Sequence, residues 1–333
     1  MKKTIIIAEG GVNHNGKVSL AKKIITKAKE AGADYIKFQL YDADALSSSK
    51  ANKANYQKKF NENETQKEML KKYQMSFRQI QDLRKFAKKK KIKFMLSIFD
   101  DVSAKNLKYL NLDYIKIPSG EIDNLPMLDE VSKLNSNIII STGMSSLKEI
   151  KRTWLFLKKR VSNKKKIFVL HCNTSYPTPP KDVNIGVIDQ FKKIFGSDIG
   201  FSDHTIGSEA SIIAVAKGAK IIEKHVTLDR NMAGPDHSSS LDFNQFKSLV
   251  LSIRKVEKFF SSQKKIVTKS EKKNIRHVRK SIVAKEKIIK GEMFSLNKLC
   301  IKRPGNGLKP SYIFKLIKKR SKFNFKKDDL IKI

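Results

Sequence analysis

Two histidines, His204 and His225, each follow a short apolar run with the composition of a β-strand, at residues 198–201 and 219–224. A helix-like run at residues 206–217 separates them. In a βαβ unit parallel strands finish at the same edge, so imidazoles about 20 residues apart meet in space. Imidazoles on rigid supports are typical metal ligands. Two ordinary loop histidines would give the same local pattern, so the rest of the chain has to decide.

Polar side chains follow the other apolar runs as well. Lys37 and Lys116 offer two fixed cations, and short donors accompany them at Ser119, Ser141, Asn173 and Ser202. Together these groups suit a phosphorylated or carboxylated anion. The two imidazoles suit a divalent ion such as Mn²⁺ or Zn²⁺, which polarises a carbonyl group. Glu9 and Glu121 are candidates for an acid/base beside the metal or for sugar hydroxyls, and Cys172 is expected to be structural.

The elements that would position these residues alternate along the chain. Strands are expected at residues 4–8, 34–39, 92–97, 114–117, 137–141, 167–170, 198–201 and 219–224. Helices are expected at residues 17–31, 77–89, 102–110, 125–134, 147–159, 187–195, 206–217 and 243–260. Eight strand–helix pairs predict an α/β fold of the (β/α)8 TIM-barrel type, with a doubly wound open sheet as the alternative. No Gly-x-Gly-x-x-Gly follows the first strand, which argues against a dinucleotide-binding sheet.

Composition shifts divide the chain into three parts. Residues 1–262 hold the barrel, with a long polar insertion at residues 41–73, and residues 263–278 are polar and charged, as a linker would be. Residues 279–333 contain short β-like pieces broken by glycines and Pro310. This last part is predicted to be a small, mostly β domain, too small to be very stable alone.

The formal net charge of +38 is the unusual bulk property. A balance of this size favours a nucleic-acid or polyanion binder, but the lysines are scattered along helices rather than gathered in one segment. We therefore expect a solvated basic surface and no nucleic-acid partner. Two cysteines indicate a reducing compartment, no apolar run is long enough to cross a membrane, and Glu9 interrupts any signal-peptide core. A cytoplasmic protein with no membrane partner is predicted.

A series of short motifs runs along the chain. They are Ala8-Glu9, Asn13-His14-Asn15-Gly16, Lys37-Phe38-Gln39, Lys116 to Glu121, Ser141 to Met144, His171 to Asn173, Tyr176 to Pro179, Ser202 to Thr205, Glu223 to His225, Gly234 to His237 and Lys302 to Gly307. These motifs resemble those of the sialic acid synthase (N-acetylneuraminate synthase) family, in the same order over nearly the whole chain, and the last part of the chain is similar to that family's antifreeze-like (SAF) domain.

The resemblance implies a metal-dependent condensation of phosphoenolpyruvate with an open-chain N-acetylated amino sugar, releasing phosphate by C–O cleavage. It implies Mn²⁺, or Mg²⁺ or Co²⁺ in its place, on His204 and His225, with Glu9 near metal and substrate. It assigns phosphoenolpyruvate to Lys37, Lys116, Ser119, Ser141, Asn173 and Ser202. It assigns the sugar to Gln39, Glu121, Tyr176 and Asp236, with Arg303 reaching the partner chain's site in a domain-swapped homodimer.

Two questions stay open on the sequence. The family often has Ser-Thr-Pro-Phe where this chain has Ser97-Ile98-Phe99-Asp100, so a hydroxyl near the phosphoenolpyruvate carboxylate is missing or comes from Ser97. The acceptor is N-acetylmannosamine or a related sugar, and an N,N'-diacetyllegionaminate or pseudaminate synthase shares the same motifs. A polyanion binder remains the alternative from another class.

Overall fold

The protein is described from a computed structural model. It covers residues 3–53, 64–162, 164–260, 262 and 264–333. The chain forms two compact units, Met1–Ser261 and Ser262–Ile333. Residues 261 and 263, on either side of the predicted barrel–linker boundary, lie outside the described residues.

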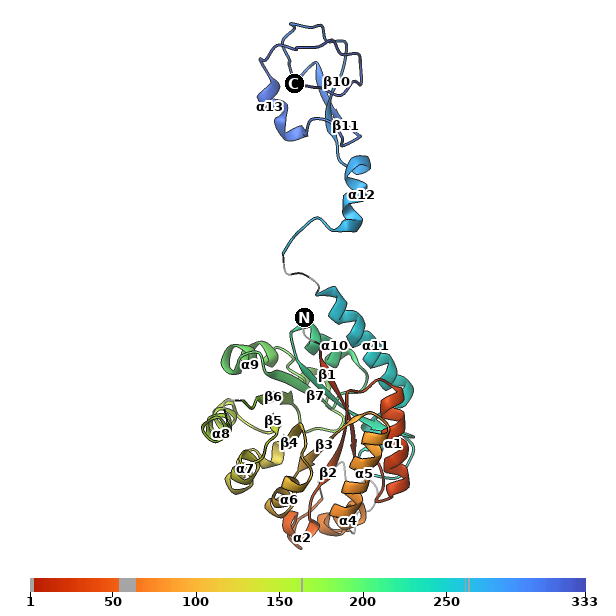
Figure 1. Ribbon diagram of the computed structural model, residues 1–333, viewed down its shortest axis with the longest axis vertical. Coiled ribbons are helices and arrows are strands. Elements are labelled where there is room, and N and C mark those ends of the chain that lie inside the picture. Colours follow the sequence, from red (N-terminus) through yellow and green to blue (C-terminus); the bar gives the residue numbers. More distant parts are fainter. Residues whose placement is uncertain (1–2, 54–63, 163, 261, 263) are drawn as a thin grey trace. The chain divides into compact units, whose positions relative to one another are not determined.

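The first unit is a closed parallel barrel (Figure 1). Each strand pairs with the next in sequence order, and β1 pairs with β8 to close the ring. The barrel strands are β1 (Ile5–Gly11), β2 (Tyr35–Leu40), β3 (Lys93–Ile98), β4 (Tyr114–Ile117), β5 (Asn137–Ser141), β6 (Ile167–Cys172), β7 (Ile199–Asp203) and β8 (Ile221–Thr227). A two-residue strand, β9 (Leu241–Asp242), pairs in parallel with the end of β8. The TIM-barrel prediction is confirmed.

Helices surround the strands (Figure 1), and most of them bury an apolar face in the main core against the sheet. They are α1 (Val18–Glu30), α2 (Ala43–Leu46), α4 (Gln66–Tyr73), α5 (Phe77–Lys89), α6 (Asp101–Asn106), α7 (Leu125–Ser132), α8 (Leu147–Arg160), α9 (Val187–Phe195), α10 (Glu209–Ala216) and α11 (Phe243–Phe259). Ser76, Ser146 and Asp242 begin three of them with capping boxes. The segment predicted as a polar insertion carries α2 and α4, and residues 54–63 of it lie outside the described residues.

The barrel interior has two levels. The lower level is an apolar cluster that includes Ile7, Met95, Ile139, Leu170 and Ile221, all buried. Side chains alternate between the two faces of a strand, so the residue two positions further along each strand also points inward. Those positions hold polar groups, and they form the upper level at the carboxyl ends of the strands, where the site lies.

The second unit has its own small core. Strands β10 (Ser281–Ala284) and β11 (Leu299–Lys302) pair antiparallel, and α13 (Ile313–Leu316) packs nearby. The core includes Ile282, Phe294 and Phe325. The predicted linker at 263–278 contains helix α12 (Lys269–Val278). Thr268 and Glu271 form a capping box there, a local signal strong enough to begin a helix in a polar sequence.

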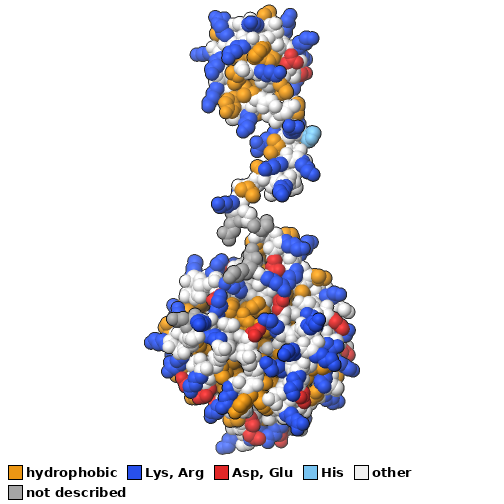
Figure 2. Space-filling model, viewed as in Figure 1, with side chains coloured by type: hydrophobic (Ala, Val, Ile, Leu, Met, Phe, Trp, Pro, Cys, Tyr) orange, Lys and Arg blue, Asp and Glu red, His pale blue; other side chains and the backbone are white. Residues whose placement is uncertain are grey.

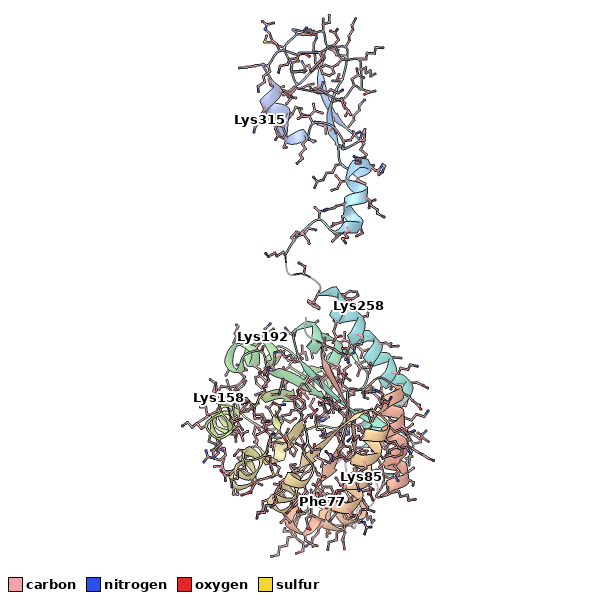
Figure 3. All side chains as sticks on the ribbon, in the orientation of Figure 1. Phe77, Lys85, Lys158, Lys192, Lys258 and Lys315 are labelled. Carbon is pink, nitrogen blue, oxygen red and sulfur yellow. The ribbon has the colours of Figure 1, made fainter. Side chains whose placement is uncertain are left out.

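The basic residues do not gather on one element. Lys and Arg side chains are spread over the visible surface of both units (Figure 2), and Lys85, Lys158, Lys192 and Lys258 project from four different barrel helices (Figure 3). All four are exposed. Among the described residues, no helix combines the length and the apolar composition required to span a bilayer.

Candidate active site

Strand register brings three predicted site residues to one level of the barrel. Glu9 of β1 stands opposite Lys37 of β2 on one side and opposite His225 of β8 on the other. Gly11 has a φ of +48°, a conformation that favours glycine, and its backbone passes close to the Glu9 and His225 side chains. A Cβ at Gly11 would lie 3.3 Å from Glu9 Oε1 and 3.4 Å from Asp236 Oδ2. The sequence placed His225 after its strand, whereas the structure places it inside β8, which continues to Thr227.

Buried charges form the floor of the site. Lys116 Nζ lies 2.8 Å from Glu223 Oε1 and 2.9 Å from Oε2, and Ser202 Oγ donates to Glu223 Oε1 at 2.9 Å. Lys37 Nζ is 3.6 Å from Glu223 Oε2. Burial alone would raise the pKa of Glu223, but the two lysines outweigh it and hold that pKa well below its usual range. The Glu223 and Glu9 carboxylates outweigh burial and raise the pKa of Lys37, whereas burial and the neighbouring Lys37 lower the pKa of Lys116 despite its ion pair with Glu223.

Glu9 forms the second carboxylate of this floor. It is fully buried and ion-paired with Lys37, which also donates to Ser97. Burial raises the pKa of Glu9 to about 7, although Lys37 opposes the change. Ser97 lies on the cavity wall beside Lys37, so a hydroxyl is present at the position that the sequence left open.

The two imidazoles face each other with ring centroids 5.4 Å apart. His204 Nδ1 is 2.6 Å from the Asn173 carbonyl oxygen, which makes Nδ1 the donor, so that Nε2 carries the lone pair when the ring is neutral. Burial alone would lower the pKa of His204, but the Cys172 thiol and the Asn173 carbonyl outweigh it and raise that pKa. His225 Nδ1 is buried with no hydrogen-bond partner in the described part of the chain, and lies 3.8 Å from Asp236 Oδ2. Burial, with His204 and Lys37 nearby, holds the pKa of His225 well below its usual value. His225 is therefore a neutral imidazole.

A cavity of about 350 Å³ opens above these groups. Ten of the predicted site residues line it: Lys37, Gln39, Lys116, Ser119, Ser141, Tyr176, Ser202, His204, His225 and Asp236. Ser141 Oγ is buried without a hydrogen-bond partner among the described residues, as a group that donates to a bound anion would be. Burial raises the pKa of Asp236 to about 6, so this carboxyl exchanges a proton near neutral pH.

Four predicted residues do not line the cavity. Glu9 lies directly beneath it against Lys37, and the Glu121 carboxylate accepts from Asn124 Nδ2 at 2.8 Å. The Asn173 amide donates to the Asp182 carbonyl at 2.8 Å, so only its main chain contacts His204. Arg303 belongs to the second unit, where its Nε donates to the Val278 carbonyl at 3.1 Å.

The sequence missed several cavity residues. Glu223 was named at a strand end but not assigned a role, and its place two residues after the inward-facing Ile221 was the available signal. Cys172 was expected to be structural, yet it lines the cavity with Sγ 3.8 Å from His204 Nδ1. The nearby His204 and Lys116 outweigh burial and lower the pKa of that thiol. Apolar cavity residues of α2 and α4 had no sequence signal, because they come from the insertion at residues 41–73, which has no clear period.

These features define a class. A parallel eight-stranded barrel whose carboxyl end holds two buried lysines, two neighbouring imidazoles and one unpartnered hydroxyl, at Ser141, has the arrangement of an enzyme that binds an anionic substrate. The chain belongs to the NeuB family, whose model matches residues 24–265. It is a synthase of the sialic acid (nonulosonic acid) type.

Known relatives cover nearly the whole chain. The chain is 46% identical over 333 residues to the N,N'-diacetyllegionaminic acid synthase of Campylobacter jejuni, covering 100% of both. It is 35% identical to the human N-acetylneuraminate-9-phosphate synthase, covering 98% of this chain and 90% of that one. The crystal structure of the N-acetylneuraminic acid synthetase of Leptospira borgpetersenii in complex with citrate matches with a TM-score of 0.72 and 32% identity, over 82% of this chain and 90% of that one.

Proposed function

We propose that this enzyme condenses phosphoenolpyruvate with an open-chain acetamido sugar. The observation that carries the proposal is one cavity lined by two buried lysines, Lys37 and Lys116, and by two imidazoles, His204 and His225. Lys37 and Lys116 bind the phosphate and carboxylate of the anion, and the hydroxyls of Ser141, Ser119 and Ser97 complete its hydrogen bonds.

The bond changes assign work to particular groups. C3 of phosphoenolpyruvate bonds to the aldehyde carbon of the sugar, which uses the C2=C3 double bond, and the aldehyde oxygen takes up a proton to become a hydroxyl. Water adds to the cationic C2 and loses its protons, and the C2–O bond to phosphate breaks to leave a ketone at C2. The lysines hold the anion so that C3 faces the aldehyde, which lies at His204 and His225. Glu9 has a pKa of about 7, so it exchanges protons near neutral pH. It takes a proton that the added water releases.

The residues fit a divalent ion. His225 Nδ1 is an orphaned buried nitrogen, and His204 keeps Nε2 free because Nδ1 donates to a carbonyl. No cluster of three or more His, Cys, Asp or Glu side chains suited to a metal occurs among the described residues, so two imidazoles would hold the ion together with substrate or water. When bound, Mn²⁺, Mg²⁺ or Co²⁺ supplies a Lewis acid for the aldehyde oxygen.

We propose that the acceptor carries two acetamido groups. The chain is 46% identical to a relative named for the diacetyl product and 35% identical to one named for N-acetylneuraminate 9-phosphate. The alternatives are N-acetylmannosamine and the acceptor of a pseudaminate synthase. Phosphate release measured with each sugar in turn distinguishes them.

Assembly and location complete the proposal. The small unit is inferred to be an antifreeze-like domain that reaches a partner's barrel in a domain-swapped homodimer, with Arg303 on the acyl end of the sugar. A cytoplasmic location is supported by two free cysteines, Cys172 and Cys300, as suits a reducing compartment.

Metal removal tests the proposed function. Chelation should abolish phosphate release from phosphoenolpyruvate and the sugar, and added Mn²⁺ should restore it in the wild type. His204→Ala should lower turnover by about 10³-fold and should not be rescued, because one of two protein ligands is gone. His277→Ala, on exposed α12, is the matched control and should keep full activity. Calorimetric titration with Mn²⁺ gives a readout independent of turnover.

The basic surface suggests the alternative function, binding of a polyanion, and the same variant tests it. A polyanion binder would retain binding in His204→Ala and lose it steeply as salt is raised. Full turnover in His204→Ala, or turnover that survives complete chelation, contradicts the metal assignment.

A further inference from the structure

One side of the cavity is apolar. Its side chains are Leu46, Met69, Leu70, Tyr73 and Phe99, which we name the apolar wall. Four of them, all except Met69, pack on a separate cluster formed by Val12, Tyr41 and Ala43. They come from α2, α4 and the loop after β3, whereas the imidazoles come from β7 and β8. Because α2 and α4 follow β2 and Phe99 follows β3, the wall stands two to four strands around the ring from β7 and β8, on a different side of the cavity from the histidines.

Hydrogen bonds fix this wall to the barrel. Tyr41 OH donates to the Leu70 carbonyl at 3.0 Å, which ties the end of β2 to α4. The Asp42 N–H donates to Asp100 Oδ2 at 2.9 Å, and the Ala43 N–H donates to Gln74 Oε1 at 3.0 Å. Tyr41 and Phe99 add an edge-on ring contact with centroids 6.2 Å apart. A wall held at several points is preorganised for one shape of ligand.

The wall contains one amide in an otherwise apolar surface. Gln66 also lines the cavity, and its Oε1 accepts from Ser47 Oγ at 3.0 Å. That bond directs the Gln66 NH₂ group to act as a donor elsewhere. A sugar hydroxyl against Leu70 or Met69 would lose its water without a replacement partner. An acetamido group fits instead, because its methyl contacts the apolar side chains and its carbonyl accepts from Gln66.

We propose that the apolar wall reads a second acetamido group on the acceptor, at the end remote from the aldehyde, and that Leu70 with Gln66 determines this specificity. The inference rests on the proposed function, which places the aldehyde at His204 and His225. The cavity volume of about 350 Å³ lies within the range of small-molecule sites, so the acceptor extends across the cavity to the wall.

Substrate discrimination in matched variants of α4 tests this inference. In Leu70→Gln, kcat/KM for a diacetamido sugar should fall about 10-fold, mainly through KM, whereas kcat/KM for N-acetylmannosamine and KM for phosphoenolpyruvate should not change. Leu70→Met keeps the apolar contact and should retain the wild-type preference. Lys71→Gln places the same amide on the exposed side of α4 and should behave as wild type.

Failures of the two proposals look different. If Leu70→Gln lowers kcat/KM equally for both sugars, or leaves their ratio unchanged, the wall does not read the second acetamido group and the synthase assignment stands. A wild-type enzyme that prefers N-acetylmannosamine to the diacetamido sugar also contradicts the proposed role of the apolar wall. If the wild-type enzyme releases no phosphate from phosphoenolpyruvate with any acetamido sugar, both the proposed function and the proposed role of the apolar wall are wrong.

Discussion

The two inward-facing levels of the barrel lie on the same strands and differ completely in chemistry. Ile7, Met95, Ile139, Leu170 and Ile221 form the lower level. Two residues further along the same strands stand the members of the upper level: Glu9, Ser97, Ser141, Cys172 and Glu223. Tyr35 and Tyr114 bear the same relation to Lys37 and Lys116. A rise of about 6.6 Å along a strand therefore separates an apolar core from a charged floor.

The difference teaches how one scaffold separates stability from reactivity. The lower level packs tightly enough that β7 has room only for Gly200, where a Cβ would meet the Ile221 carbonyl oxygen at 2.6 Å. The upper level holds buried charges that cost free energy to desolvate. Because its ions are partnered mainly with each other, the upper level is preorganised for a substrate anion and adds little to stability.

Removing the charges of the upper level should have the largest effect. In the double variant Lys116→Met, Glu223→Met, turnover should fall by at least about 10³-fold, because the anion loses a fixed cation. The free energy of unfolding should stay within about 1 kcal/mol or increase, since apolar residues replace a buried ion pair. Phosphate release and urea denaturation check the two halves. Lys116→Met alone leaves Glu223 incompletely paired and should destabilise by about 3 kcal/mol.

Truncating a side chain of the lower level should lower stability and leave substrate binding almost unchanged. Ile139→Ala, two residues below Ser141 on β5, should lower the free energy of unfolding by about 2–5 kcal/mol, because it leaves a cavity in a packed layer. KM for phosphoenolpyruvate in the folded fraction should change less than threefold, an order-of-magnitude expectation for a residue outside the cavity. If Ile139→Ala abolished turnover without destabilisation, the two levels would not be separable.

The smallest effect is expected for Ser141→Ala, which tests the upper level on the strand, β5, that carries Ile139 in the lower level. Ser141→Ala removes a buried hydroxyl that has no hydrogen-bond partner among the described residues, so the free energy of unfolding should change by less than about 0.5 kcal/mol. KM for phosphoenolpyruvate should rise about 10-fold, because the anion loses one donor. A large stability loss in this variant would show that Ser141 belongs to the core rather than to the site.

Much of the site was predictable because strand ends converge in any parallel barrel. Residues toward the carboxyl ends of the apolar runs, such as Lys37 and Lys116, or just after them, such as His204, were expected at one edge, and the structure brings them to one cavity. Asn173 and Glu121 show the limit of that reasoning. A strand-end position fixes the main chain, whereas the direction of the side chain depends on partners such as the Asp182 carbonyl and Asn124.

The sequence by itself determined the barrel, the order of its strands and the two histidines and two lysines of the site, because periodicity and strand-end position are local properties. Tertiary structure alone decided that Glu223 bridges the two lysines, that Cys172 lies against His204, and that α2 and α4 supply an apolar wall. The physical reason is that these contacts join residues far apart in the chain. Ring closure brings them within a few ångströms of one another, and no local pattern encodes that distance.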